Sequence, residues 1–262
     1  MVPQLTNQEL EQFAEIAYKE LGIIISNQKH ALLQNRLGRR LRELGLRSFR
    51  EYYQYLLAHK AETQEFIEAV TTNETYFFRC PKHFHMLGQQ IFPNIKSELI
   101  NIWSAACSNG SEPYSLAIVA HERLPDFEKR SVNVWASDID LKILKKADEG
   151  VYDTHILRLA REDVLHKYFI QIKPQLYQVI PALREILLLG QHNLQHRFTK
   201  AKMDVIFCRN VLIYFDNQSK QTVFQNLVEA LKPGGYLFLG ESEIIPDLPG
   251  MHRIDASVAV KK

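Results

Sequence analysis

The stretch INIWSAACSNGSEP, residues 100–113, is the part of the sequence that indicates the fold most clearly. It opens with a short apolar run, continues through small and polar residues, and leads into a helical pattern at about 114–124. Pro113 suits the first turn of that helix. We therefore expect a buried strand, then a loop whose backbone N–H groups can closely approach a ligand, and then a helix.

The alternation of apolar runs and helical stretches continues toward the C-terminus. Strands are expected at 100–103, 132–136, 205–208 and 236–239, and helices near 141–149 and 219–231. This order is typical of βαβ units and predicts a parallel sheet covered on both faces. Lys232–Gly235 predicts a turn before its strand, and 257–260 predicts one more strand, an antiparallel edge. Between about 151 and 194 the period breaks, and 168–172, 176–180 and 186–189 predict a small antiparallel excursion.

Residues 1–70 have a helical pattern throughout. Thr6 with Glu9 and Ser48 with Glu51 have the spacing of capping boxes. A second helix is expected from about residue 28 to Leu44, followed by Gly45 as its cap, and a fourth at about 62–70. The apolar stripe of the second helix consists of Leu33, Leu37, Leu41 and Leu44. These patterns predict a small helical bundle.

Composition narrows the class of protein. At about 150 residues per domain, 262 residues correspond to roughly two domains or one large one. The net charge of +2 predicts neither nucleic acid nor a membrane surface as a partner. The cysteines (Cys80, Cys107 and Cys208) are far apart, which favours reduced thiols, and the first residues lack a signal-peptide pattern. We expect a soluble, cytoplasmic, monomeric protein without direct membrane insertion.

The residues that follow the expected strands are candidates for a ligand site, because ligands bind at the carboxyl ends of parallel strands. The loop after the first strand lacks the GxGxxG pattern of dinucleotide sites. We assign Asp138 to ribose hydroxyls and Asp140 to the cap of the next helix. Arg209 and Asn210 follow a later strand, with Tyr214 one turn further. Together these residues favour a nucleoside ligand with little phosphate, and S-adenosylmethionine fits that description.

Five segments, taken as a set, resemble the CheR family of S-adenosylmethionine-dependent methyltransferases, which esterify glutamates on chemotaxis receptors. They are 71–79 (TTNETYFFR), 103–115, 136–140 (ASDID), 206–216 and 231–233 (LKP). The resemblance implies a class I, Rossmann-like α/β fold with a mostly parallel sheet, an N-terminal helical bundle and a small antiparallel β-subdomain. The implied domains are a receptor-recognition domain at 1–70, a linker at 71–98 that contributes to the cofactor site, and a methyltransferase domain at 99–262 with the β-subdomain within about 151–194.

The resemblance also implies a site. The catalytic positions, closest to the transferred methyl group, are Arg79 and Tyr214. The positions that bind S-adenosylmethionine, or the product S-adenosylhomocysteine, are Asn73, Thr75, Arg79, Ala105, Glu112, Asp138, Asn193, Leu194, Arg209 and Asn210. The family commonly differs at Glu74, Tyr76, Ser111 and Glu241. Glu74 and Tyr76 lie inside the best-matched motif, so they could alter substrate fit.

The chemistry agrees with such a site. A glutamate carboxylate is ionised at neutral pH, so methylating it needs no general base. Arg79 is the candidate to orient that carboxylate, with the Tyr214 hydroxyl as a second donor.

The second helix offers a candidate docking face for the receptor. Arg36, Arg39 and Arg40 have helical spacing and lie opposite much of the leucine stripe. The alternatives for this basic face are a solvated surface or RNA binding. We favour docking of the acidic methylation helices of the receptor, with recruitment to membrane receptor arrays as a further expectation. The histidines show no ligand spacing, so no metal is expected.

Three alternative functions stay open. One is a methyltransferase of the same fold that acts on another protein or a small molecule. Another is a module that senses S-adenosylmethionine or its demethylated product without turnover. A nicotinamide oxidoreductase is disfavoured because the glycine pattern is missing.

Overall fold

The computed structural model describes residues 3–25 and 29–262 of the chain. These residues fall into two compact units. The first comprises the chain up to Thr72 together with Tyr214–Gln221, and the second comprises Asn73–Ile213 together with Thr222–Lys262. No helix in the described ranges is long and apolar enough to cross a membrane.

The first unit is helical, as the sequence predicts. Its helices are α1 (Asn7–Leu21), α2 (His30–Leu44), α3 (Phe49–Ala58) and α4 (Glu62–Val70). The capping box at Thr6 and Glu9 is confirmed, because each side chain accepts a hydrogen bond from the backbone N–H of the other. Gly45 ends α2 with φ +70°, a conformation that glycine adopts without strain. The predicted start of this helix at residue 28 lies outside the described residues.

Aromatic and leucine side chains form the core of the helical unit. Phe13 lies 5.8 Å from Tyr52 and 5.9 Å from Phe66, measured between ring centroids. Leu33, Leu37 and Leu41 of α2 are buried, which confirms most of the predicted stripe. The unit therefore has an apolar core of its own.

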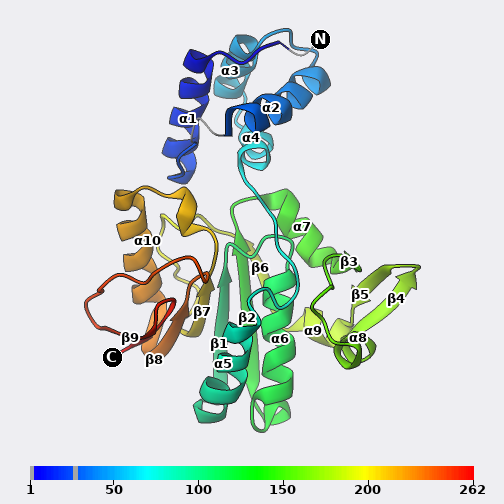
Figure 1. Ribbon diagram of the computed structural model, residues 1–262, viewed down its shortest axis with the longest axis vertical. Helices are drawn as coiled ribbons and strands as arrows, with labels where there is room; N and C mark the ends of the chain where they lie inside the picture. The colour runs from blue at the N-terminus through cyan, green and yellow to red at the C-terminus, as the bar shows by residue number, and fades with distance from the viewer. Residues whose placement is uncertain (1–2, 26–28) are drawn as a thin grey trace. The chain divides into compact units, whose positions relative to one another are not determined.

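The second unit contains a seven-stranded sheet in the order β6-β2-β1-β7-β8-β10-β9 (Figure 1). Its strands are β1 (Leu99–Ala105), β2 (Ser131–Asp138), β6 (Leu187–Gln191), β7 (Met203–Cys208), β8 (Leu231–Phe238), β9 (Met251–Asp255) and β10 (Val258–Lys261). Every pairing from β6 through β8 is parallel, and β10 is antiparallel to both of its neighbours. The sheet is thus mostly parallel, as expected.

The helices of this unit follow the βαβ order that the sequence predicts. They are α5 (Pro81–Met86), α6 (Ser111–Arg123), α7 (Leu141–Glu149), α8 (Glu162–Tyr168), α9 (Pro181–Glu185) and α10 (Asn217–Ala230), with short helices at Leu87–Ile91, Phe92–Asn94, Phe127–Lys129 and Leu212–Tyr214. The part of α10 up to Gln221 and the residue Tyr214 belong to the first unit. Helix α6 packs across β1, β2 and β6 (Figure 1). Ile102, Val134 and Phe207, from three adjacent strands, are buried in the large core that also includes residues of α5 and α6.

Three details of the sheets differ from the predictions. The small antiparallel sheet has the order β3-β5-β4, formed by β3 (Val151–Asp153), β5 (Leu176–Val179) and β4 (Phe169–Lys173). The segment 186–189 was expected there, but it belongs to β6, which pairs in parallel with β2. Its apolar residues suit either sheet, so the sequence pattern could not separate them.

The other two differences lie near the C-terminus. The final strand is antiparallel, as predicted, but β9 rather than β10 forms the edge. Residues 232–235 lie within the bounds of β8, where the register with β7 shifts between Leu231 and Tyr236. This segment is therefore an irregularity inside a strand rather than a turn before it.

Candidate active site

The carboxyl ends of the parallel strands bring the predicted site residues of this unit to one edge of the sheet. Ala105 at the end of β1 is in register with Ser137 of β2 and with Cys208 of β7. Asp138 is in register with Gln191, the last residue of β6. The residues that follow each strand therefore lie next to one another.

The loop between β1 and α6 makes a tight turn at this edge. Ala106, Ser108 and Gly110 all have positive φ. At Gly110 a Cβ atom would come within 2.8 Å of both Ala147 and the hydroxyl group of Tyr152, so only glycine fits. The backbone N–H of Ser108 donates to Asp138 Oδ2 at 2.9 Å. The loop is thus held against the end of β2.

The two acids after β2 have different environments. Asp140 caps α7, because its side chain accepts from the N–H groups of Lys142 and Ile143, which confirms the predicted cap. Asp138 is buried and accepts from the N–H groups of Ser108 and Asp140. Burial raises the pKa of Asp138 to about 6. Each carboxylate oxygen of Asp138 has a further lone pair for a ligand hydroxyl.

The 73–79 motif is tied to the same edge. The Asn73 amide donates to Asp140 Oδ2 at 3.0 Å, and the Asn73 carbonyl accepts from Ser108 Oγ at 3.0 Å. Phe78 donates its N–H to Ser115 Oγ on α6. Thr75 lies between these anchors and is half-buried. The structure therefore brings the motif to the ends of β1 and β2.

A buried ion pair joins the motif to the end of β7. Arg209 Nη1 lies 3.1 Å from Glu112 Oε2, and the Arg209 side chain is only 2% exposed. The other oxygen of Glu112 accepts from Ser104 Oγ. Arg209 Nη2 donates to the backbone carbonyl of Arg79 at 2.5 Å. Ser104, Glu112 and Arg209 thus hold the main chain of Arg79 in place.

The pKa of Glu112 reflects this burial. Desolvation raises the pKa of its carboxyl group, and the nearby Arg209 guanidinium opposes that rise. The Nε atom of Arg209 is buried and has no hydrogen-bond partner among the described residues. An unsatisfied buried donor of this kind fits a site that a polar ligand completes.

Asn210 depends on a residue that the sequence analysis left out of the site. Asn210 has φ +59°, and its N–H donates to Glu243 Oε2 at 2.8 Å. The same buried carboxylate also accepts from the N–H groups of Leu212 and Gly240. Glu243 therefore links the loop after β7 to the loop after β8. Its sequence signal was its position two residues after Glu241, where the family commonly differs.

Asn193 and Leu194 follow β6 at the same edge. His192 donates its N–H to the carbonyl of Asp138, which places this loop beside the end of β2. The Leu194 side chain is buried, and its carbonyl accepts from the Asn226 amide at 2.9 Å. Asn193 Oδ1 accepts from the N–H of Gln195.

Tyr214 belongs to the helical unit rather than to the unit that contains Arg79. Lys29 Nζ lies 4.2 Å from the centroid of the Tyr214 ring, and the Tyr214 carbonyl accepts from the N–H of Ile24. The placement of Arg79 and Tyr214 together near a transferred methyl group stays a prediction.

The three arginines predicted to dock a receptor do not form one solvated face. Arg36 donates to the carbonyls of Ala69 and Thr71, so it is engaged with the end of α4. Arg40 lies 2.7 Å from the buried carboxylate of Glu62. Arg39 is directed to solvent, with its side chain 79% exposed. The three residues have the helical spacing expected, but Arg36 and Arg40 contact α4 and only Arg39 of the three is exposed.

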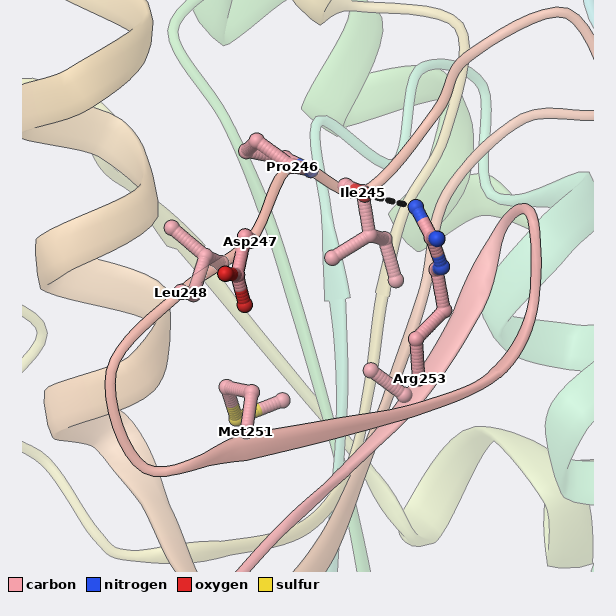
Figure 2. Close-up of a pocket in the computed structure, with 7 residues that line it drawn as sticks. Ile245, Pro246, Asp247, Leu248, Met251 and Arg253 are labelled. Atoms are coloured by element: carbon pink, nitrogen blue, oxygen red, sulfur yellow. Dashed lines mark hydrogen bonds between the residues drawn. The ribbon is translucent and has the colours of Figure 1, made fainter.

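A cavity of about 320 Å³ lies elsewhere, at the C-terminal hairpin. Figure 2 shows Asp247 and Arg253 on opposite sides of it, and Arg253 donates to the carbonyl of Ile245 at 3.3 Å. None of the site residues predicted from the sequence lines this cavity. Among the described residues, no group of His, Cys, Asp and Glu side chains is arranged to hold a metal ion.

The fold and the polar edge define the class of protein. The sheet has five parallel strands, followed by a final strand that inserts antiparallel between its last two neighbours. This is the class I methyltransferase fold, here joined to an all-α unit and a small antiparallel sheet. Asp138 at the end of β2, Glu112 in the first turn of α6 and the Arg209 Nε atom, which has no partner among the described residues, suit a ligand that carries hydroxyl, ammonium and carboxylate groups.

Comparison with known proteins gives the family. Residues 73–258 match the family described as "CheR methyltransferase, SAM binding domain", and residues 8–71 match "CheR methyltransferase, all-alpha domain". Chemotaxis protein methyltransferase 2 of Vibrio cholerae is 38% identical over 98% of this chain and 91% of its own length. The chemotaxis protein methyltransferase of Escherichia coli K12 is 36% identical over 91% and 85%. The chain belongs to the CheR methyltransferase family.

Solved structures of other methyltransferases are also similar to this chain. The rRNA methyltransferase aviRa from Streptomyces viridochromogenes is 15% identical, with a TM-score of 0.44 over 72% of this chain and 86% of that one.

Proposed function

We propose that this protein transfers the methyl group of S-adenosylmethionine to glutamate side chains of chemotaxis receptors, giving methyl esters and S-adenosylhomocysteine. The enzyme is cytoplasmic, and its partners are the methylation helices of the receptors. The observation that carries it is the buried network through which Ser104, Glu112 and Arg209 hold Arg79 at the carboxyl edge of the sheet.

The chemistry follows from the groups at this edge. The cofactor, when bound, supplies a methyl group on a positively charged sulfur. A glutamate carboxylate is already a nucleophile at neutral pH, so the protein has only to position it and to exclude water. The Arg79 side chain is half-buried, and among the described residues it donates only to the carbonyl of Glu74, which leaves other N–H groups for a carboxylate. Arg79 is therefore assigned as the positioning group for the acceptor.

The cofactor contacts are assigned from the environments of the same residues. The Asp138 carboxylate accepts the ribose hydroxyls, because it is the acidic group at the end of β2. Glu112 and Arg209 provide opposite charges for the ammonium and carboxylate of the amino-acid part of the cofactor. Asn73, Thr75, Ala105, Asn193, Leu194 and Asn210 complete the contacts. Tyr214 is assigned as a second donor near the methyl group.

Receptor docking is assigned to the exposed arginines of the helical unit. Arg39, Arg42, Arg47 and Arg50 are exposed, whereas Arg36 and Arg40 are engaged within the unit. A basic surface would attract the acidic methylation helices and raise the rate of encounter.

The test is transfer from labelled S-adenosylmethionine to receptor cytoplasmic fragments, scored as methanol released by base. We expect receptor-dependent, base-labile label, because base hydrolyses a carboxyl ester and leaves methylated nitrogen intact. Arg79→Ala should abolish transfer while the melting temperature changes little. Arg161→Ala is the matched control, since Arg161 is an exposed arginine already paired with Asp163. Normal turnover in Arg79→Ala would remove Arg79 from the mechanism, and label that is stable to base would favour another substrate.

A further inference from the structure

The ring of Tyr76 lies close to two guanidinium groups. The Arg158 Cζ atom lies 3.5 Å from the ring centroid, and the Arg79 Cζ atom lies 5.9 Å from it. Both distances fall within the range of a cation–π interaction, and the shorter one is a direct stack. Tyr76 therefore brings Arg158, from the turn after β3, next to the arginine that we assign to the acceptor carboxylate.

The backbone on both sides of this cluster is fixed. Phe77 donates its N–H to the carbonyl of Ile156 at 3.0 Å. The Phe77 ring is buried and packs edge-on against Tyr152 at 4.8 Å and Phe169 at 5.2 Å. The segment that carries Tyr76 and the turn that carries Arg158 are thus joined through one buried residue.

Neither guanidinium group forms a salt bridge within the described ranges, although Arg79 lies near enough to the buried Glu112 carboxylate to lower the pKa of that group. Arg158 Nη1 donates to the carbonyl of His155 at 2.8 Å, and Arg79 Nη1 donates to the carbonyl of Glu74 at 2.9 Å. Arg161, only three residues beyond Arg158, is by contrast paired with Asp163 at 2.7 Å. Among the described residues, the hydrogen bonds of Arg158 and Arg79 use only the Nη1 atom of each arginine, so each guanidinium group keeps N–H donors that can bind a carboxylate.

We propose that Arg158 and Tyr76 form a second carboxylate subsite beside Arg79, which holds an acidic side chain one helical turn from the glutamate that is methylated. The inference rests on the proposed function, because it takes Arg79 as the group that holds the acceptor. Side chains one turn apart on a helix have Cβ atoms about 5–6 Å apart, so two such carboxylates can reach two guanidinium groups that flank one ring.

Tyr76 is the residue that joins Arg158 to Arg79 in this subsite. It is one of the departures within the 73–79 motif, and its ring supplies the face on which Arg158 stacks. The subsite therefore acts on substrate choice, through binding of the flanking residue, and leaves the transfer step to Arg79.

The test uses the full chain and helical peptides with a single acceptor glutamate. Each peptide carries either Asp or Asn four residues before or after the acceptor. With the wild-type protein we expect a KM about tenfold lower for an Asp peptide than for its Asn counterpart, at similar kcat. Arg158→Gln should remove this preference, and leave kcat on the Asn peptides and the affinity for S-adenosylhomocysteine unchanged.

Three further variants test whether the preference depends on the Arg158 charge and on the Tyr76 ring. Arg161→Gln should keep the preference, because its guanidinium is already paired. Tyr76→Phe should keep it, since a ring remains for stacking, whereas Tyr76→Leu should weaken it.

Binding of the same peptides, measured by fluorescence anisotropy with S-adenosylhomocysteine present, does not depend on transfer. If receptor fragments and peptides are never methylated, the proposed function fails, and the binding preference still decides the subsite. If transfer occurs and Arg158→Gln keeps the Asp preference, or no preference exists at either position, the subsite is overturned and the proposed function stands.

Discussion

The protonation state of one buried carboxylate, Asp138 at the end of β2, bears directly on ligand binding. Asp138 is ionised at neutral pH although burial raises its pKa to about 6, because two backbone N–H groups stabilise its charge. An ionised carboxylate accepts hydrogen bonds from two hydroxyl groups, whereas a protonated one must donate its proton to a partner. The protonation state of Asp138 should therefore control how well a ribose is bound.

We expect the affinity for S-adenosylhomocysteine to fall as the pH is lowered through about 6, approaching tenfold per pH unit below that value. Asp138→Asn should bind roughly 10- to 100-fold more weakly at pH 7.5, since it loses hydrogen bonds to a charged acceptor, and its affinity should no longer change between pH 5.5 and 7.5. Isothermal titration calorimetry across this range measures both effects.

Acid unfolding would not produce the same result through this residue. A carboxyl group whose folded-state pKa is raised contributes stability below its unfolded pKa, and that contribution is lost as the pH rises through about 6. Acidification therefore strengthens the fold through Asp138 while it weakens ribose binding. A wild-type affinity that is flat down to pH 5.5 would exclude Asp138 as the ribose acceptor.

At the scale of elements, neighbouring arginines of helix α2 have different roles: Arg40 stabilises the helical unit, whereas Arg39 is available for recognition. Arg40 bonds both oxygens of Glu62 on α4 at 2.7 Å, and the Tyr52 hydroxyl also donates to Glu62. Within the described part of the chain, Arg39 pairs only with exposed Glu43. Buried and exposed ion pairs have very different energetic weight, so neighbouring arginines should respond differently to substitution.

We expect Arg40→Met to lower the free energy of unfolding by about 3–5 kcal/mol, because it leaves the Glu62 carboxylate buried without its cationic partner. Arg39→Met should cost less than about 0.5 kcal/mol. Urea unfolding followed by circular dichroism gives both values. Equal effects of the two substitutions would contradict the different roles of Arg40 and Arg39.

The exposed arginines of α2 should also affect how receptor fragments bind. Arg39→Glu combined with Arg42→Glu should raise the KM for receptor fragments, and the difference from wild type should shrink as salt is added. The affinity for S-adenosylhomocysteine should not change. A loss of cofactor affinity instead would contradict the docking assignment.

The sequence predicted the elements better than it predicted their partners. Capping at Thr6 and Asp140 and the helix end at Gly45 follow from local chemistry, and all three are confirmed. Local pattern could not place the strand at Leu187–Gln191 in the main sheet, because its partner β2 is distant in sequence. The candidate site residues came from motifs, but the role of Glu243 depends on contacts with Asn210 and Leu212 more than 30 residues away, which periodicity does not report.

At the scale of the whole molecule, the chain returns to its first unit late in the sequence. Residues 214–221 belong to the helical unit, where the Tyr18 hydroxyl donates to Asp216 Oδ2 at 2.9 Å and Ile23 pairs with Phe215. The N–H of Ile24 donates to the carbonyl of Tyr214 at 2.7 Å. The sequence predicts this segment as part of a domain at 99–262, because contacts between residues almost 200 positions apart leave no local pattern.

Because the helical unit holds the segment that carries Tyr214, weakening these contacts should affect transfer without changing either core. We expect Tyr18→Phe combined with Ile24→Pro to lower kcat on receptor fragments and to speed protease cleavage within 212–221, since the variant removes two hydrogen bonds that order this segment. Limited proteolysis with mass spectrometry locates the cleavage. Ile24→Ala is the matched control, because it keeps the backbone N–H and should leave cleavage and kcat near wild type. Normal protection and normal kcat in the double variant would mean that these two hydrogen bonds do not order the segment that carries Tyr214.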